Sequence, residues 1–276
     1  MLFYGFLVGP VQHFKNIILN KEYRRWCWYR TRYNINKRFQ PKRIRYENRK
    51  IYVPDITSFI YSFKSIFVDH IYDFKSYNSS PEILDLGANI GLSIIRFKQL
   101  FPNSKIQAYE ADPDIFKYLE KNVRNCEDVQ LFNKAIWNKN GYIEFEQEGA
   151  DAGKIGNKQS INAVHVETID ILDVINNKNY DFLKIDIEGS ETVVLERCKD
   201  HLSQFTYIFI EYHSQINEKQ RLNEILSYLT ESGFRYHIQP ELVSKNPFKS
   251  IDIAYGFDMQ LNVFAWNEKN SENIKY

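Results

Sequence analysis

The stretch ILDLGANIG, residues 83–91, decides the fold that we predict for this chain. A short apolar run from Glu82 to Leu86 leads directly into Gly87, and GLSIIRFKQLF after it has apolar residues at helical spacing. The predicted order is therefore strand, glycine-rich turn, helix. Gly87 and Gly91 let the backbone turn tightly and approach a ligand, and the helix offers that ligand its positive N-terminus.

Strands and helices continue to alternate after this turn. KIQAYE, which ends at Glu110, is predicted as a second strand, and Asp112 followed by Pro113 is typical of a helix start. Further strands are expected in VQLFNKAIW, DFLKIDI, TYIFIEYH, FRYHIQ and LNVFAW, and further helices in SETVVLERCKDHL and in NEKQRLNEILSYLTES, which ends at Gly233. This alternation predicts a mostly parallel sheet with helices on both faces and ligands at the carboxyl ends of the strands.

The glycine turn lacks the GxGxxG pattern of a dinucleotide site, because Asn89 occupies the middle glycine position. This counts against a nicotinamide oxidoreductase. Glu110 ends the second strand about 20 residues after the glycines, where a carboxylate accepts hydrogen bonds from both ribose hydroxyls. A ligand with a ribose and an amino-acid part, but no phosphate, fits both features. The alternatives are that Asp85 only caps the amides of the turn and that Glu110 is an exposed strand end.

Several segments together resemble the FkbM family of S-adenosylmethionine-dependent methyltransferases: ILDLGANIG, AYEADP, NKAIWNKNG, VETIDIL, FLKIDIEGSE and FIEYH. The resemblance covers residues 81–213, and KIDIEGSE is its most specific part. It implies an α/β fold with the Rossmann-like sheet of class I methyltransferases, seven mostly parallel strands with the last antiparallel. It also implies S-adenosylmethionine as cofactor and methylation of a hydroxyl oxygen on a sugar, glycan or related small acceptor.

The same resemblance implies roles for individual residues. Four residues of the turn would lie around the methionine part of the cofactor: Asp85, Gly87, Asn89 and Gly91. Glu110 would hold the ribose, Ala135 and its neighbours would lie by the adenine, and Asp186 would stand on the cofactor side. Lys134 precedes Ala135 where many class I methyltransferases have an acid for the adenine amine, so this contact departs from the family pattern.

Methylation of a hydroxyl also needs a group that takes the hydroxyl proton, because the sulfonium already activates the methyl group. Four candidates for the catalytic site follow the fourth and fifth predicted strands: Asp186, Glu188, Glu211 and His213. A neutral imidazole has a suitable pKa near neutrality, and Glu211 on the same face could orient it. We therefore predict His213 as the base. The alternatives are that Glu188 caps the helix beginning near Ser190 and that His213 lies in a surface loop.

A metal site is a further hypothesis, because Asp186, Glu188 and His213 could gather a hard divalent cation that binds acceptor hydroxyls. No HExxH or paired-cysteine spacing supports it, so the sequence predicts no metal. The three cysteines are too scattered for a disulfide framework or a thiolate site, which predicts reduced thiols: Cys27, Cys126 and Cys198.

Residues 1–78 match no family pattern and are predicted to form a basic, aromatic, helical extension before a methyltransferase domain at 79–276. The stretch from Lys21 to Lys50 holds twelve Lys or Arg against two acidic residues, whereas the whole chain carries a formal charge of +1. Such a stretch, interleaved with aromatic residues, suits an anionic membrane surface, a phosphorylated carrier or nucleic acid. The alternative is an amphipathic helix whose Arg stems cover aromatic rings.

The opening segment MLFYGFLVGPVQHF has no basic leader or cleavage site and is too short to span a bilayer, so we expect a cytoplasmic protein, at most peripheral to the membrane. A nucleic-acid adenine methyltransferase would carry an Asn-Pro-Pro-aromatic element after the fourth strand, where IDIEG stands. Nucleic acid is therefore not the expected partner. The remaining alternatives are another N-methyltransferase and a non-catalytic adaptor at a membrane surface.

Overall fold

The computed structural model describes residues 13–33, 38–146, 154–155 and 163–267. The chain forms two compact units, the first ending at Asp73 and the second beginning at Phe74, a few residues before the predicted domain start at 79. Among the described residues, no helix combines the length and the apolar character needed to span a membrane.

The first unit combines helices with one β-hairpin around an aromatic core. Its elements in chain order are α2 (Lys21–Arg32), β1 (Lys42–Tyr46), β2 (Arg49–Val53), α3 (Ile56–Phe63) and a π-helical segment, Lys64–Val68. The antiparallel hairpin was missed in the sequence analysis, which predicted only helix here. Its strands alternate basic residues outside with apolar residues inside, such as Ile44 and Ile51, and this period of two is the signal that the charge pattern obscured.

Several basic side chains of the stretch from Lys21 to Lys50 lie over aromatic rings within this unit. The guanidinium carbon of Arg25 is 5.1 Å from the ring centre of Tyr46, and that of Arg30 is 4.8 Å from the ring centre of Trp26. These contacts are those of the packed alternative, in which Arg stems cover aromatic rings.

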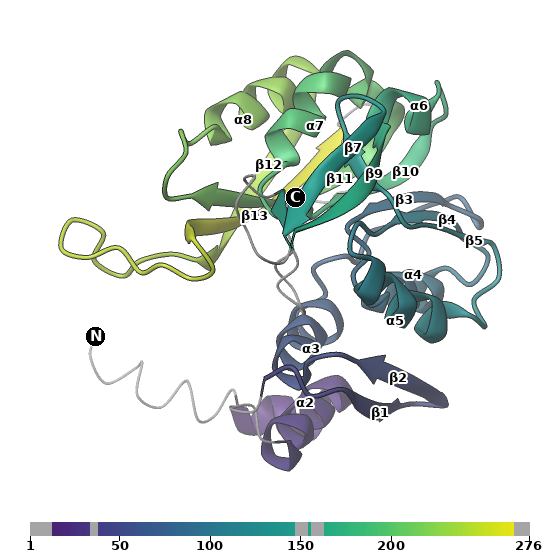
Figure 1. Ribbon diagram of the computed structural model, residues 1–276. Helices are drawn as coiled ribbons and strands as arrows, with labels where there is room; N and C mark the ends of the chain where they lie inside the picture. The colour runs from purple at the N-terminus through teal and green to yellow at the C-terminus, as the bar shows by residue number, and fades with distance from the viewer. Residues whose placement is uncertain (1–12, 34–37, 147–153, 156–162, 268–276) are drawn as a thin grey trace. The chain divides into compact units, whose positions relative to one another are not determined.

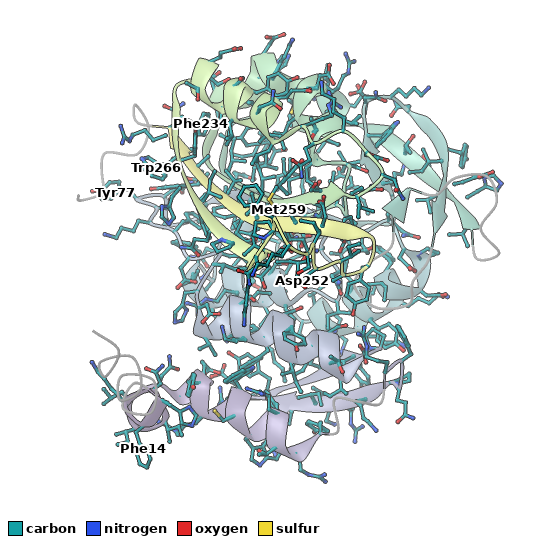
Figure 2. The ribbon with its side chains drawn as sticks, turned by 90° about the vertical axis from the view of Figure 1, so that its left-hand side faces the viewer. Phe14, Tyr77, Phe234, Asp252, Met259 and Trp266 are labelled. Carbon is teal, nitrogen blue, oxygen red and sulfur yellow. The ribbon has the colours of Figure 1, made fainter. Side chains whose placement is uncertain are left out.

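The second unit is built on a seven-stranded sheet with the order β12-β13-β11-β10-β3-β4-β5 (Figure 1). The strands are β3 (Glu82–Leu86), β4 (Lys105–Tyr109), β5 (Val129–Phe132), β10 (Tyr180–Ile185), β11 (Phe205–Gln215), β12 (Phe234–Leu242) and β13 (Phe257–Asn267). β13, the last strand among the described residues, runs antiparallel to both of its neighbours, β11 and β12, and the other pairings in this sheet are parallel. Figure 2 labels Met259 and Trp266 on β13. The expected class I methyltransferase sheet is therefore confirmed.

Helices cover both faces of this sheet. The helices α4 (Leu92–Leu100) and α5 (Pro113–Val123) lie on one face, and α6 (Ile171–Ile175), α7 (Glu191–Cys198) and α8 (Leu222–Glu231) lie on the other (Figure 1). The predicted start of α5 is confirmed, because the Asp112 carboxylate accepts the backbone N–H of Asp114 at 2.8 Å. Gly233 follows the end of α8 with φ +81°, as predicted, but this helix begins at Leu222, later than predicted.

A second sheet, of four strands, was not predicted. It contains β6 (Ala135–Trp137), β7 (Gly141–Glu146), β8 (Lys154–Ile155) and β9 (Ala163–Asp170) in the order β6-β9-β7-β8. The run VQLFNKAIW, predicted as one strand, is divided between β5 and β6 and so between two sheets. The two strands are separated at Asn133, whose side-chain amide donates to the carbonyl oxygens of Glu110 and Ala111 at 2.8 and 3.2 Å.

Candidate active site

The turn after β3 and the loop after β10 touch through their backbones. Gly87 has φ +83°, and a Cβ on it would lie 1.8 Å from the carbonyl oxygen of Asp186. The N–H of Asp186 donates to the carbonyl oxygen of Leu86 at 3.1 Å. This glycine was predicted to make room for a ligand, but the contact that requires it is with the loop after β10.

The rest of the turn is fixed by α5 and by Glu110. A Cβ on Gly91, whose φ is +86°, would lie 2.7 Å from Val123 and 2.8 Å from Leu119, so this glycine allows the start of α4 to pack against α5. Asn89 has φ +47°, and its N–H donates to Oε2 of Glu110 at 2.8 Å. The conformation of the turn is therefore fixed by its contacts with α5 and with Glu110, without a ligand.

Glu110 is a buried carboxyl group directly after β4, so the exposed-strand-end alternative is wrong. Besides the N–H of Asn89, it accepts the N–H of Asp112 on Oε1 at 2.8 Å. Burial, only partly offset by these two hydrogen bonds, raises the pKa of Glu110 to about 7. A carboxylate has about four acceptor positions, so each oxygen keeps room for one more donor, such as a hydroxyl.

Asp85 faces the interior and not the outer side of the turn. Its residue is fully buried, and Oδ2 accepts the hydroxyl of Ser93 at 2.5 Å. The Lys184 ammonium lies 3.4 Å from Oδ1 of Asp85 and 3.2 Å from Oδ2 of Asp186, and it donates to the carbonyl oxygen of Gly87 at 2.7 Å. Asp85 thus acts on the turn through Ser93 and Lys184. The sequence analysis missed Lys184, although a lysine within the apolar strand DFLKIDI was a signal.

Ala135 lies in a small apolar cluster next to Glu110. It is 7% exposed and forms a cluster with Val166, against which Ala111 also packs. Lys134, which departs from the family pattern, pairs instead with Glu167 at 2.6 Å. This small apolar cluster, with no acid at position 134, therefore includes Ala111, the residue directly after the carboxyl group predicted to hold the ribose.

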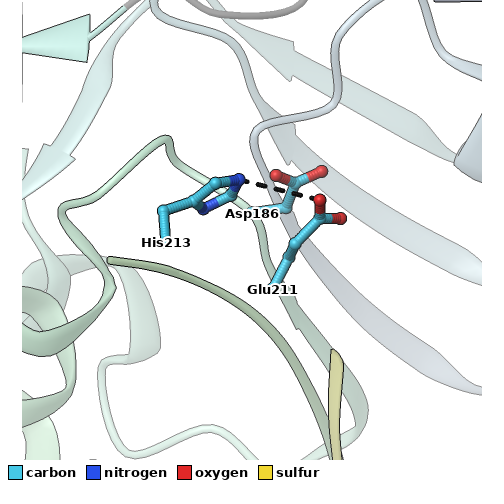
Figure 3. A group of neighbouring side chains, drawn as sticks. All are labelled: Asp186, Glu211 and His213. Carbon is cyan, nitrogen blue, oxygen red and sulfur yellow. Dashed lines mark ion pairs between the residues drawn. The ribbon is translucent and has the colours of Figure 1, made fainter. Parts of the chain in front are cut away.

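The four predicted catalytic residues come together at the ends of β10 and β11. Figure 3 shows the side chains of Asp186, Glu211 and His213 directed toward one another, and one ligand atom from each lies within 4.8 Å of the others. Nε2 of His213 is 3.6 Å from Oε1 of Glu211 and 3.4 Å from Oε2 of Glu188. His213 belongs to β11 and is buried, so the surface-loop alternative is wrong.

The residue that orients His213 is Glu191, which the sequence analysis did not select. Its Oε1 lies 3.1 Å from Nδ1 of His213 and accepts the backbone N–H groups of Ile187 and Gly189 at 3.3 and 2.9 Å. Because Oε1 already accepts two backbone N–H groups, it serves as an acceptor here, and Nδ1 is the donor. The available signal was the position of Glu191 at the end of KIDIEGSE.

Glu188 does not cap α7, so this alternative is also wrong. The backbone amides ahead of the helix are bound by Glu191, while the carboxylate of Glu188 turns to His213. Glu188 has φ +55°, a left-handed conformation that costs a residue with a Cβ on the order of 1 kcal/mol. Such conformations cluster at functional sites.

The cluster carries excess negative charge in a mostly buried place, where the side chains of Asp186, Glu188 and Glu211 are 23%, 19% and 20% exposed. Burial raises the pKa of Glu188 well above its ordinary value, and burial with the nearby Asp186 raises the pKa of Glu211 to about 8. Burial by itself would lower the pKa of His213, but the carboxylates of Glu188, Glu191 and Glu211 outweigh it and raise that pKa well above the ordinary value. The proton of the imidazole is thus tied to the carboxylates around it, so His213 and Glu188 act as a pair.

A model of the Methyltransferase FkbM domain matches residues 85–236, more than half of the chain. The chain belongs to the FkbM methyltransferase family. The match begins at Asp85 and includes the whole glycine turn, Glu110 and the cluster around His213, so the family that the sequence motifs resemble is confirmed.

Two relatives of this FkbM-family chain are named methyltransferases. It is 27% identical over 156 residues to the 2-O-methyltransferase NoeI of Sinorhizobium fredii, and this alignment covers 49% of the chain and 64% of the relative. It is 45% identical over 65 residues to methyltransferase sdnD of Sordaria araneosa, 24% of each protein. Each alignment thus spans less than two thirds of the relative.

Solved structures show the same kind of likeness. The crystal structure of methyltransferase FkbM from Methylobacillus flagellatus is 14% identical, with a TM-score of 0.45 over 75% of this chain and 53% of that one. Fibrillarin from Aeropyrum pernix, solved with bound S-adenosyl-L-methionine, is 12% identical, with a TM-score of 0.42 over 83% of this chain and 84% of that one.

Proposed function

We propose that this FkbM-family protein transfers a methyl group from S-adenosylmethionine to a hydroxyl oxygen of a sugar, a glycan or a related small acceptor. The proposal depends on two sites at one edge of the sheet. Glu110 binds the glycine turn, and the cluster of Glu188 and His213 follows the strand next to that turn. The name of the NoeI relative, a 2-O-methyltransferase, supports oxygen as the methylated atom. Transfer of labelled methyl to a hydroxyl tests it.

The residues around the glycine turn fit the cofactor. Glu110 keeps acceptor positions for two ribose hydroxyls, and the small side chains of Ala111 and Ala135 provide an apolar surface for the adenine. Asp85 contributes by holding the turn through Ser93. When bound, the cofactor supplies a methyl group that its sulfonium has already activated.

The cluster at the ends of β10 and β11 would take the proton of the acceptor hydroxyl. We propose that Glu188 accepts this proton, because its carboxylate does not cap α7 and lies 3.4 Å from Nε2 of His213. Glu191 fixes the imidazole through Nδ1, so His213 positions Glu188 and holds its charge in place. The close contact between the backbones of Gly87 and Asp186 would keep the cofactor and the acceptor at a fixed distance from each other.

The affinity for S-adenosylhomocysteine is expected to depend on pH through Glu110. Its pKa is raised to about 7, and only the ionised carboxylate is a strong acceptor for ribose hydroxyls. Affinity should therefore increase up to about tenfold between about pH 6 and about pH 8. The stability of the unliganded protein should change in the opposite direction, because a raised folded-state pKa contributes stability at low pH that is lost as the pH rises through about 7.

Calorimetric titrations across this pH range would measure the effect. Glu110→Gln should bind more weakly and with a flat pH profile, whereas Glu120→Gln, an exposed site on α5, should behave like the wild type. If the Glu110→Gln variant kept the full pH dependence, the ribose assignment would be wrong.

For the first unit we propose contact with an anionic membrane surface. Large apolar side chains are exposed there beside the basic stretch: Phe14 is 68% exposed, Ile18 67% and Leu19 71%. Figure 2 labels Phe14. Apolar side chains that insert at the interface, next to bases that attract anionic lipid, are the two parts of a peripheral membrane contact.

Co-sedimentation with phosphatidylserine vesicles is expected to be strong at low salt and to weaken as salt rises, because each Lys or Arg near the surface contributes about 1 kcal/mol and is screened over about 8 Å at physiological ionic strength. Leu19→Ser should weaken binding at every salt concentration. Neutral vesicles should bind far less. Absence of binding at low salt would favour the packed alternative.

A further inference from the structure

The side chains of Asp186, Glu211 and His213 form a mixed carboxylate and imidazole set that nothing in the proposed methyl transfer fully explains. We propose that they bind a divalent metal ion, which in turn binds the acceptor hydroxyl. The role of the ion rests on the proposed function, whereas its binding does not. No metal was predicted from the sequence, where the set considered had Glu188 in place of Glu211 as the third ligand.

The spacing of the three ligand atoms suits a metal ion. They lie within 4.8 Å of one another and come from β11 and the end of β10 (Figure 3). Bonds of about 2.0–2.3 Å place ligands about 3 Å apart when adjacent and about 4–4.6 Å apart when opposite. Small side-chain movements would therefore complete the site. Lys184 pairs with Oδ2 of Asp186, so that Oδ1 can turn to the ion.

The imidazole of His213 is oriented as in known metal sites. Glu191 accepts Nδ1–H at 3.1 Å and is itself fixed by two backbone N–H groups, so the Nε2 side faces the carboxylates. A carboxylate or carbonyl behind a metal-binding histidine commonly fixes its tautomer and ring direction in this way. An ion pair between His213 and the carboxylates at Nε2 would not require Glu191 to bind Nδ1 as well.

The charge around the site also favours a dication. Four carboxylates converge there: Asp186, Glu188, Glu191 and Glu211. In the part of the chain that the structure describes, the cations within 4 Å of them are His213 and Lys184. Carboxylates this close repel one another. A divalent ion that replaces the Nε2 proton of His213, with that proton released to solvent, would offset their charge.

Asn262 supplies an independent observation. It is 3% exposed, and its Oδ1 is buried without a hydrogen-bond partner. Its Nδ2 donates to Glu241 at 3.3 Å, and Asn262 stands opposite Glu211 in the β11–β13 register, so both side chains lie on the same face of the sheet. An amide oxygen is a ligand for hard cations, and the side chain of Asn262, on the same face of the sheet as Glu211, would offer this oxygen to the ion.

The ligand set indicates a first-row divalent ion such as Mn²⁺. Carboxylate and amide oxygens suit hard ions, while an imidazole nitrogen favours first-row transition metals over Mg²⁺ or Ca²⁺. Three protein ligands leave positions open for an acceptor hydroxyl. A hydroxyl bound to the ion loses its proton more readily, and Glu188, 3.4 Å from the same imidazole nitrogen, stands next to it as the acceptor of that proton.

The test uses the full chain, freed of metal with a chelator and titrated with Mn²⁺ under electron paramagnetic resonance. We expect one saturable site and, in pulsed spectra, a coupling to an imidazole nitrogen. His213→Gln should remove that coupling, and both His213→Gln and Glu211→Gln should weaken Mn²⁺ binding at least tenfold. The control His165→Gln, an exposed histidine on β9, should bind Mn²⁺ as the wild type does.

Circular dichroism confirms that each variant is folded, and Glu211→Gln, with almost unchanged shape, serves where His213→Gln is unstable. No saturable binding, or equal binding by folded wild type and Glu211→Gln, overturns the site. Undiminished methyl transfer after chelation overturns the role of the ion while leaving the proposed function standing. Mn²⁺ binding with imidazole coupling, but no methyl transfer to any hydroxyl, supports the site and counts against the function.

Discussion

Glu188→Gln is expected to lower the single-turnover rate of methyl transfer by about 10²–10⁴-fold while leaving the affinity for S-adenosylhomocysteine nearly unchanged. The amide has almost the same shape as the carboxylate but cannot take a proton. Glu188 makes no helix cap, since Glu191 binds the amides of Ile187 and Gly189, so little stability should be lost. Rapid-quench rates and calorimetric affinities, measured on the same samples, separate rate from binding.

Two further variants interpret this result. Glu218→Gln, an exposed residue after β11, should match the wild type. Glu191→Gln should lower stability as well as rate, because Glu191 both holds the loop and orients His213. Full activity of Glu188→Gln, together with loss of activity in His213→Ala, would return the role of base to the imidazole, as first predicted from the sequence.

Gly87→Ala is expected to destabilise the protein by about 2–5 kcal/mol, combining the strain of a left-handed conformation with overpacking. The new Cβ would lie 1.8 Å from the carbonyl oxygen of Asp186, so one of the two loops must move. The movement would separate the glycine turn, which we propose faces the cofactor, from the loop that carries Asp186 and Glu188. Denaturant unfolding measures the loss of stability.

Gly233→Ala is the matched control for this substitution. Gly233 has nearly the same φ, +81°, but a Cβ there would meet nothing within 4 Å. Its substitution should cost on the order of 1 kcal/mol, the strain of the left-handed conformation alone. Equal losses of stability at both glycines would show that the contact between Gly87 and Asp186 has no energetic weight.

Local signals account for the parts of the fold that the sequence predicted. The strand from Glu82 to Leu86 was predicted with the bounds that the structure has, because Gly87 ends it, and Asp112 with Pro113 marked the start of α5. The division of VQLFNKAIW had no such signal. It depends on the side chain of Asn133 binding backbone carbonyls near Glu110, more than 20 residues away in sequence.

The parts of the candidate site that depend on local spacing were likewise predicted, and those that depend on packing between distant elements were not. Glu211 and His213 share a face because strand side chains alternate with a period of two, which is readable locally. The pairing of Glu191 with His213 is not readable in this way, since it requires α7 to pack beside β11. The inward direction of Asp85 was also hidden, because a parallel strand buried on both faces shows no polar alternation.

The most direct test of the central claim follows the methyl group itself. The protein is incubated with S-adenosylmethionine carrying a ¹³C-labelled methyl group and with a panel of sugars and glycans, and the products are separated by liquid chromatography and examined by carbon NMR. We expect the label to appear as a methoxy carbon on an acceptor hydroxyl, at a rate that Glu188→Gln lowers. Label on nitrogen or carbon, or cofactor binding without transfer to any acceptor, would contradict it.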